Sequence, residues 1–411
     1  MTTTTTFPPM PLLPITSPST IAACRNLPLR PSDIFICSYP KSGTTWTQHI
    51  VLSLLLADRR YRISAAAAAA AGDEDDDIPY NHVSDYAPFF EIDAHWQESS
   101  ANSSSDTATA PMMELAESVQ KNHARLGRRV FNTHLRWDML PKKREFADAT
   151  SSSTQQQKDD DNNNDGNNKE RRRPQCGKFI YITRNQIDVV TSFYHHLSNQ
   201  KEGTYTDTFE TFVADWMDGK IPFGSSLDHL MSFAEGFAVD NALYDTTSSS
   251  DDDDNSSCSS SIGRPLLLLS YEQLKSNLRT EVHRIISFLN LTHIPMHVLN
   301  EELLPSFEFH SMKDNIHKFQ PKSVGWLNGF QFLRRGVVGD GRRLMMLLNS
   351  KSGNDDSSTD NGGDGDGEGK SSELMDAYND WVEREGYHSK ITNLLQDECY
   401  KECREVFLSV V

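Results

Sequence analysis

The sequence predicts an α/β fold: a single domain built on a central parallel β-sheet, with helices on both faces of the sheet. Four short apolar runs alternate with stretches of helical periodicity, which is typical of strand–helix units in a parallel sheet. These runs are residues 34–37, 129–131, 179–182 and 266–269. Because ligands of open α/β sheets bind outside the carboxyl ends of the strands, we expect the polar residues that follow the runs to meet at one edge. Those residues are Lys41, His134, Arg184 and Tyr271.

The first strand leads through a tight turn, residues 39–45, into a helix with one apolar side. The turn contains one glycine, one lysine and three hydroxyl side chains from Ser or Thr. Free backbone N–H groups and the positive end of a helix dipole favour a phosphate or sulfate at such a turn. The turn is P-loop-like, but it is not a complete GxxxxGK[ST] motif because Lys41 precedes Gly43. An ordinary strand-to-helix turn with a solvated lysine remains the alternative.

The later elements are predicted from their periodicity and from the polar residues around them. Further helices are expected at residues 114–125, 209–216, 278–289 and 374–411, and a turn-rich, partly basic region at 306–340. Aromatic residues gather between positions 78 and 96, where they indicate either ordinary core or an apolar wall for a small ligand. The candidates for such a wall are Tyr86, Phe89, Phe90 and, in a later turn, Phe223.

The formal net charge of −18 does not indicate a basic partner, because much of it lies in low-complexity tracts. Four such tracts hold 19 of the 58 acidic residues. We therefore predict residues 1–30 as an N-terminal extension and 31–411 as one domain with insertions. The insertions are expected near 65–77, 97–110, 149–173, 246–261 and 350–372. Nothing in the sequence indicates nucleic-acid binding.

The cysteines and the N-terminus indicate a cytoplasmic protein without membrane contact. Six cysteines without regular spacing are typical of reduced intracellular thiols and not of a disulfide framework. The N-terminus has no basic region followed by a long apolar core, so we expect neither a secretory signal nor a membrane anchor. Its Thr-rich, acid-poor composition leaves an organelle transit peptide as the alternative.

Three motifs and a histidine, in this order, resemble the cytosolic (soluble) sulfotransferase family, which uses the donor 3′-phosphoadenosine 5′-phosphosulfate (PAPS). The first motif is Tyr39-Pro40-Lys41-Ser42-Gly43-Thr44-Thr45-Trp46, the second is Arg184-Asn185 with Ser192, and the third is Arg334-Arg335-Gly336-Val337-Val338-Gly339-Asp340. Thr133-His134-Leu135 lies where the family has its catalytic histidine. The resemblance extends from about Pro31 to Asp340 and implies a P-loop-like fold, similar to that of nucleoside-triphosphate hydrolases.

The resemblance also implies roles for individual residues. His134 is expected to be the general base, and Lys41 to stabilise charge in the transition state. The donor's 5′-phosphosulfate is expected at Lys41, Ser42, Gly43, Thr44 and Thr45. Its 3′-phosphate is expected at Arg184, Ser192, Arg334, Arg335 and Gly336, and its adenine at Trp46, Tyr271, Ser306 and Phe307. The neighbouring His195 and His196 are expected to be structural.

The implied reaction is transfer of a sulfuryl group by in-line displacement to a hydroxyl or amine of a small, apolar acceptor. Sulfuryl transfer spreads negative charge over oxygens, so positioning and charge stabilisation account for most of the catalysis, as in phosphoryl transfer. A neutral histidine suits the role of base, and two arginines suit a phosphate. We expect no metal. The acceptor's identity and the oligomeric state stay open.

This chain departs from the family pattern at several positions. Asn132 stands where the family has a lysine two residues before the histidine, Pro305 where it has a threonine, and Gly341-Arg342 where it has Trp-Lys. The family's C-terminal dimerisation motif is not recognisable. Two alternatives follow: a catalytically inactive, nucleotide-binding module, and a P-loop kinase or hydrolase, which the incomplete P-loop and the lack of an acidic metal motif disfavour.

Overall fold

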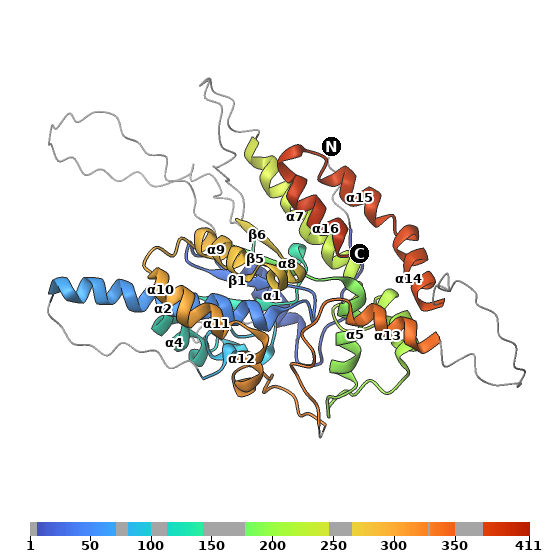
Figure 1. The fold of residues 1–411 in the computed structure, drawn as a ribbon, viewed down its shortest axis with the longest axis horizontal. Coiled ribbons are helices and arrows are strands. Elements are labelled where there is room, and N and C mark those ends of the chain that lie inside the picture. The colour runs from blue at the N-terminus through green and yellow to red at the C-terminus, as the bar shows by residue number, and fades with distance from the viewer. Residues whose placement is uncertain are drawn as a thin grey trace, which may run out of the picture.

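The computed structural model describes seven stretches of the chain (Figure 1). They are residues 6–70, 81–99, 113–142, 177–245, 265–327, 329–349 and 373–411. Most residues of the five predicted insertions lie outside these stretches. The exceptions are residues 65–70, which continue a long helix, and residues 97–99.

The centre of the fold is a four-stranded parallel sheet in the order β4-β1-β5-β6. Its strands are β1 (Ile34–Cys37), β4 (Val130–Thr133), β5 (Lys178–Thr183) and β6 (Leu266–Ser270). Phe35 on β1 lies opposite Phe131 on β4 and Phe179 on β5, which sets the register at the centre. This sheet confirms the predicted fold class. A separate antiparallel pair, β2 (Trp96–Glu98) and β3 (Met113–Leu115), was not predicted.

Helices cover both faces of the sheet (Figure 1). The α-helices are α1 (Pro18–Asn26), α2 (Thr44–Ala70), α3 (Val83–Tyr86), α4 (Glu117–Leu126), α5 (Gln186–Leu197), α6 (Phe209–Met217), α7 (Ser226–Asp245), α8 (Tyr271–Ser276), α9 (Leu278–Leu289), α10 (Met296–Val298), α11 (Leu304–Ser306), α12 (Phe309–Asp314), α13 (Asp340–Asn349), α14 (Glu373–Arg384), α15 (Tyr387–Leu394) and α16 (Lys401–Ser409). Short 3₁₀ or π turns are η1 (Asp93–His95), η3 (Trp137–Met139), η4 (Leu299–Leu303), η5 (Ile316–Lys318) and η6 (Glu398–Tyr400).

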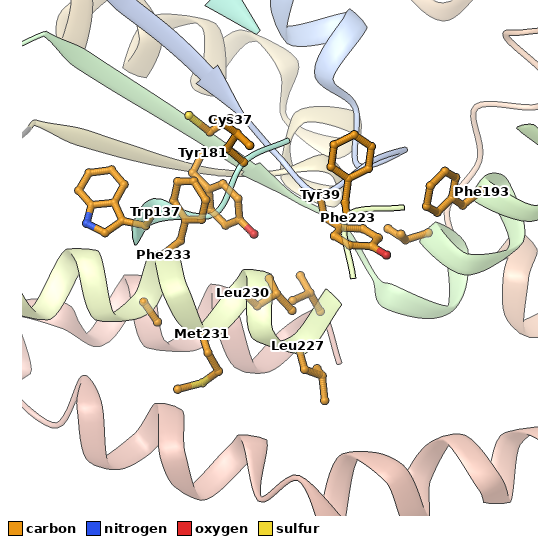
Figure 2. Close-up of a cluster of buried hydrophobic side chains, with 14 of the residues drawn as sticks. Cys37, Tyr39, Trp137, Tyr181, Phe193, Phe223, Leu227, Leu230, Met231 and Phe233 are labelled. Carbon is orange, nitrogen blue, oxygen red and sulfur yellow. The ribbon is translucent and has the colours of Figure 1, made fainter. Parts of the chain in front are cut away.

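Alternation along the strands divides the core into two halves. Phe35 and Cys37 point to one face of β1, and Ile34 and Ile36 to the other, as the period of two in a strand requires. The first half packs against α5, α6, α7 and the C-terminal helices, and the second against α2, α3, α9 and α12. Figure 2 shows part of the first half, where the rings of Tyr181 and Phe233 stack with centroids 3.8 Å apart.

Several element boundaries differ from the sequence-based expectation. The second strand is Val130–Thr133 and not 129–131, so it ends one residue before His134. The helix expected from position 114 begins at Glu117, because residues 113–115 pair with β2 instead. The Ala run continues α2 as far as Ala70, which fits the high helix propensity of alanine.

The described part of the predicted N-terminal extension, residues 6–30, packs against the same core. Phe7, Met10 and Leu12 pack against the first half of the core. The backbone N–H of Phe223 donates to Pro11 O at 2.7 Å, so this segment contacts the turn before α7. Within the described residues, no helix has both the length and the apolar character needed to cross a membrane.

A buried ion pair ties the start of β1 to the start of β4. Arg129 Nε donates to Asp33 Oδ1 at 2.7 Å, and the side chains are 7% and 0% exposed. We expect Asp33→Ala to lower the free energy of unfolding by about 3 to 5 kcal/mol, because it leaves a buried guanidinium unpaired. Urea denaturation measures the loss. The double variant Asp33→Leu/Arg129→Met should recover most of it, and a loss below about 1 kcal/mol in the single variant would contradict the argument.

Candidate active site

The residues predicted at the carboxyl ends of the strands lie together. The Arg184 side chain, just after β5, reaches the turn after β1, where its Nη1 lies 3.4 Å from Lys41 O. The same guanidinium lies over the ring of Tyr271, which follows β6, at 4.3 Å from the ring centroid. The His134 ring, just after β4, bonds to Ser38 O at the end of β1. One edge of the sheet therefore holds two cations, one imidazole and one phenol ring.

The turn after β1 has an unusual backbone conformation. Lys41 adopts φ 69° and Gly43 φ 110°, and positive φ is uncommon for a residue with a side chain. A Cβ atom on Gly43 would lie 2.9 Å from Cδ2 of Tyr271, so the close approach of this ring also requires glycine. The turn ends at the N-terminus of α2. It thus places Lys41 three residues before the first residue of α2, where backbone N–H groups and the positive end of the helix are found.

Lys41 has no carboxylate partner among the described residues. Its Nζ lies 3.2 Å from Nδ1 of His196 and 4.6 Å from the ring centroid of Phe332. Burial, together with the nearby positive charge of Arg184, lowers the pKa of Lys41 to about 7. Both effects disfavour the charged ammonium, and an anion at this position would relieve them.

Arg184 is incompletely paired although its side chain is only 11% exposed. Its contacts to Lys41 O, Asp188 Oδ2 and Val337 O are all 3.4 Å long, and its buried Nε has no hydrogen-bond partner. Buried donors in proteins are normally satisfied. A mostly buried guanidinium with an unused donor is therefore a suitable site for an anion.

His134 is held as one tautomer. Its Nδ1 lies 2.8 Å from Ser38 O, and a carbonyl oxygen only accepts, so Nδ1 carries the hydrogen. In the neutral ring Nε2 then has the free lone pair. Burial lowers the pKa of His134 to about 4, and the charge of Lys41 acts in the same direction. The ring is therefore neutral at physiological pH, with Nε2 able to accept a proton.

Two predicted arginines are paired with a carboxylate. Arg335 Nη1 lies 2.6 Å from Asp340 Oδ1, and Arg334 contacts the other oxygen of the same carboxylate. The loop that carries them is held over α5 by Asp188, which accepts from the N–H groups of Gly339 at 2.9 Å and Gly341 at 2.7 Å. No local pattern in the sequence indicates this function of Asp188, because the loop residues it holds lie 151 and 153 residues later in the chain.

The residues expected near the adenine are only partly brought together. Trp46 and Tyr271 form an edge contact with centroids 5.5 Å apart, and Trp46 Nε1 donates to Phe307 O at 2.8 Å. The Phe307 ring is fully buried against His49, so it offers no free face to a ligand. The Ser306 hydroxyl donates to Leu303 O. Gly336, with φ 62°, lies against the ring of Phe309.

The remaining predicted site residues lie in the turn after β1 and on α5. Ser42 is almost fully buried, Thr45 is half-buried, and Ser192 is half-buried on α5 between Arg184 and His196. The Thr44 hydroxyl lies 2.5 Å from that of Ser38 and so links the turn to the residue that binds His134.

The four candidate wall residues separate into two pairs. Phe89 and Phe223 pack against His134, each with a ring centroid 5.1 Å from that of the imidazole, and their own centroids are 6.2 Å apart. Phe223 holds this position with φ 71°. All three of Phe223, Tyr86 and Phe90 are buried, at 4%, 2% and 1% exposed, but the Tyr86 and Phe90 side chains lie in the core on opposite faces of the sheet without a described ring contact to His134. An aromatic-rich sequence does not tell which rings face a site, and we do not retain Tyr86 and Phe90 as wall residues.

His196, which was expected to be structural, contacts Lys41 and lies beside the rings of Trp326 and Phe332. One further expectation needs correction. The amide of Asn132, considered as a donor to the site, donates to Ala87 O at 2.7 Å. That amide is committed to the backbone before β2 and does not replace a lysine.

The sequence is similar to a sulfotransferase family model and to several sulfotransferases. A family model described as Sulfotransferase domain matches residues 31–149, 170–244 and 263–351. Sulfotransferase 1E1 of Rattus norvegicus is 24% identical over 316 residues, which is 76% of this chain and 78% of that protein. Sulfotransferase 1C2 of Oryctolagus cuniculus is 26% identical over 328 residues, 78% of this chain and 80% of that protein.

A solved structure shares the fold. The crystal structure of mouse sulfotransferase SULT7A1 complexed with PAP has a TM-score of 0.50 at 17% identity. The alignment covers 97% of this chain and 96% of the mouse protein. At this level of identity the likeness indicates a common fold and nothing more.

Proposed function

The chain belongs to the sulfotransferase family, whose enzymes depend on PAPS, and from this premise we propose the residues that bind the donor and perform the transfer. The reaction is transfer of a sulfuryl group to a hydroxyl or amine of a small acceptor. One observation supports the proposal above the others. Two mostly buried cations, Lys41 and Arg184, lie side by side at the N-terminus of α2 without full counter-charges, next to a neutral histidine.

The residues fit the phosphate groups of the donor. Lys41, with the turn Ser42–Thr45, is proposed to bind the 5′-phosphosulfate, because positive charge and free N–H groups converge there. Arg184, Ser192, Arg334, Arg335 and Gly336 are proposed for the 3′-phosphate, and Trp46 and Tyr271 for the adenine. The mouse protein that shares the fold was crystallised with PAP, 3′-phosphoadenosine 5′-phosphate, which supports a nucleotide as the ligand.

The proposed chemistry needs one proton transfer and one centre of positive charge. The donor, when bound, supplies the sulfuryl group. His134 Nε2 accepts the proton of the acceptor's hydroxyl or amine, because Nδ1–H is committed to Ser38 O. Lys41 stabilises the negative charge that develops on the departing phosphate. Phe89 and Phe223, whose rings contact both His134 and each other, are the proposed apolar wall for the acceptor.

Titration of the protein with PAP in the presence of EDTA tests the donor site. We expect metal-free binding, and we expect Arg184→Ala to weaken it by about 10- to 100-fold, since charged hydrogen bonds contribute about 1.5 to 3 kcal/mol. Arg384→Ala, which removes an exposed arginine on α14, is the matched control and should bind like the wild type. Absence of binding by folded wild-type protein, or equal affinity in Arg184→Ala, would refute the assignment.

PAP binding should also weaken as the pH rises above about 7. The pKa of Lys41 is lowered to about 7 in the free protein, and a bound anion raises it. Binding therefore takes up a proton above that pH, whereas a lysine of ordinary pKa takes up none until about pH 9. Calorimetry in two buffers of different ionisation enthalpy measures the uptake. Uptake that persists unchanged in Lys41→Met would show that another group titrates.

One alternative is supported by a specific observation. The amide of Asn132 is committed to Ala87 O, so the described site lacks the cation that the family has before its histidine. A catalytically inactive module that binds the nucleotide is therefore the second candidate. Such a module binds PAP but turns over none of a panel of phenols, alcohols and amines.

A further inference from the structure

The backbone N–H and the backbone C=O of His134 each form a hydrogen bond with a buried side chain. Its backbone N–H donates to Glu91 Oε1 at 2.7 Å. Its backbone C=O accepts from Nε2 of His229 at 3.1 Å. With Nδ1 bound to Ser38 O, every polar group of this residue except Nε2 has a fixed partner.

Glu91 reaches His134 from a segment 43 residues earlier in the chain. Its side chain is fully buried, and burial raises the pKa of the Glu91 carboxyl to about 8. At neutral pH the carboxyl is therefore mostly protonated, and one of its oxygens still accepts the N–H of His134. Two residues before Glu91 lies Phe89, whose ring packs on the His134 ring, so one short segment holds both the backbone and the ring.

His229 reaches His134 from α7, 95 residues later. Because a carbonyl oxygen only accepts, His229 Nε2 carries a hydrogen. Burial lowers the pKa of His229 to about 3, so the ring is neutral and its Nδ1 is an acceptor. The hydroxyl of Tyr181 on β5 donates to that atom at 3.1 Å. The rings of Tyr181, His229 and Phe233 stack, which fixes the orientation of the imidazole.

The side chains of Glu91, Tyr181 and His229 are buried in a mostly apolar part of the core. Glu91, Tyr181 and His229 are all 0% exposed, and Phe233 beside them is also fully buried. Burying a polar group costs free energy that its hydrogen bonds only roughly offset, and apolar side chains of equal size often pack as well or better. Stability alone therefore does not explain why two separate segments direct buried polar side chains to one peptide.

We propose that Glu91 and His229 are positioning residues that fix His134, with Tyr181 setting the tautomer of His229. The proposal rests on the proposed role of His134 as the base. Misplacement of a reacting group by about 1 Å can cost roughly 100-fold in rate, and supporting hydrogen bonds prevent it. Neither residue touches the reacting atoms. Both act through the His134 peptide.

Two variants test the proposal. A conservative variant and a matched control distinguish loss of positioning from loss of stability. Glu91→Met and His229→Phe keep the volume but remove the hydrogen bond. We expect kcat to fall at least about 10-fold in each with PAP affinity unchanged, and Glu91→Gln, which keeps an acceptor oxygen, to retain most of the activity. His123→Phe is the matched control, because buried His123 also donates its Nε2 hydrogen to a backbone carbonyl, that of Val130 on β4.

A measurement that needs no acceptor accompanies the kinetics. Nitrogen-15 NMR of histidine-labelled protein, with His134 assigned by its loss in His134→Gln, reports the tautomer and pKa of that ring. In the wild type we expect the Nδ1–H tautomer. In Glu91→Met and His229→Phe we expect a mixture of tautomers and a pKa closer to the ordinary value. If His229→Phe does not fold, Tyr181→Phe tests the same contact with a smaller expected loss of about 3-fold.

The outcomes separate this proposal from the one on which it rests. If the two variants match His123→Phe in kcat and in the His134 spectrum while His134→Gln is inactive, positioning is refuted and the base assignment stands. If His134→Gln is as active as the wild type, the base assignment itself fails. Loss of turnover in both variants, with rescue by Glu91→Gln, supports the proposal.

Discussion

His134→Gln is expected to lower kcat by about 100- to 10,000-fold, the range that a positioned general base contributes. The variant should bind PAP as tightly as the wild type, because the cations at the donor site remain in place. Glutamine keeps a polar side chain of similar reach but cannot take up the proton. Turnover with the best acceptor from a panel of phenols, alcohols and amines, measured beside PAP titration, gives both quantities.

The control for this variant is His388→Gln, which replaces an exposed histidine on α15. It should leave kcat unchanged. A His134→Gln enzyme with wild-type kcat would contradict the proposed base. Wild-type protein that binds PAP and turns over nothing would favour the inactive module, for which His134→Gln changes nothing measurable.

The pH profile gives a second check on the same residue. The pKa of His134 is lowered to about 4, and the base is the neutral form. With saturating donor, kcat should therefore be constant from about pH 7 down to about pH 5 and fall only as the ring becomes protonated below that. An unburied histidine would lose activity near its ordinary pKa of about 6.5.

The sheet and its edge were predictable because the signal for them is local. An apolar run followed by a polar turn indicates a buried strand and its carboxyl end wherever it occurs, and parallel topology brings these ends together. Lys41, His134, Arg184 and Tyr271 were therefore identified without knowledge of their contacts. The boundary of β4 moved because pairing with β1 extends the strand to Thr133.

The supporting contacts were not predictable because they are set by packing between distant segments. Glu91 and His229 lie 43 and 95 residues from His134 in the sequence, and no local pattern couples them. Aromatic residues present the same difficulty. Phe89 flanks His134 while the adjacent Phe90 lies in the core, since neighbouring side chains point in different directions.

Lys41→Met is expected to lower kcat by about 100- to 1,000-fold, comparable to the loss of one preorganised donor in an oxyanion hole. Methionine has nearly the same length and an apolar stem, so the turn and its packing against Phe332 should persist. PAP affinity should fall by less than kcat. The reason is that the ammonium is most useful where charge develops, whereas Arg184 and the backbone N–H groups still bind the nucleotide.

The contact between Lys41 and His196 indicates why the charge of Lys41 is available for the reaction. His196 Nδ1 accepts from Lys41 Nζ at 3.2 Å, so a neutral imidazole, and not a carboxylate, holds the ammonium in place. A neutral partner leaves the positive charge available for the reaction, whereas a carboxylate would cancel much of it. Lys41→Arg should not restore kcat, because the planar guanidinium does not match a site built for a compact ammonium. Lys390→Met, at an exposed position on α15, is the control. If Lys41→Met changed kcat by less than about 3-fold while weakening PAP binding strongly, Lys41 would bind the ground state and transition state equally, and its role in the transfer would be refuted.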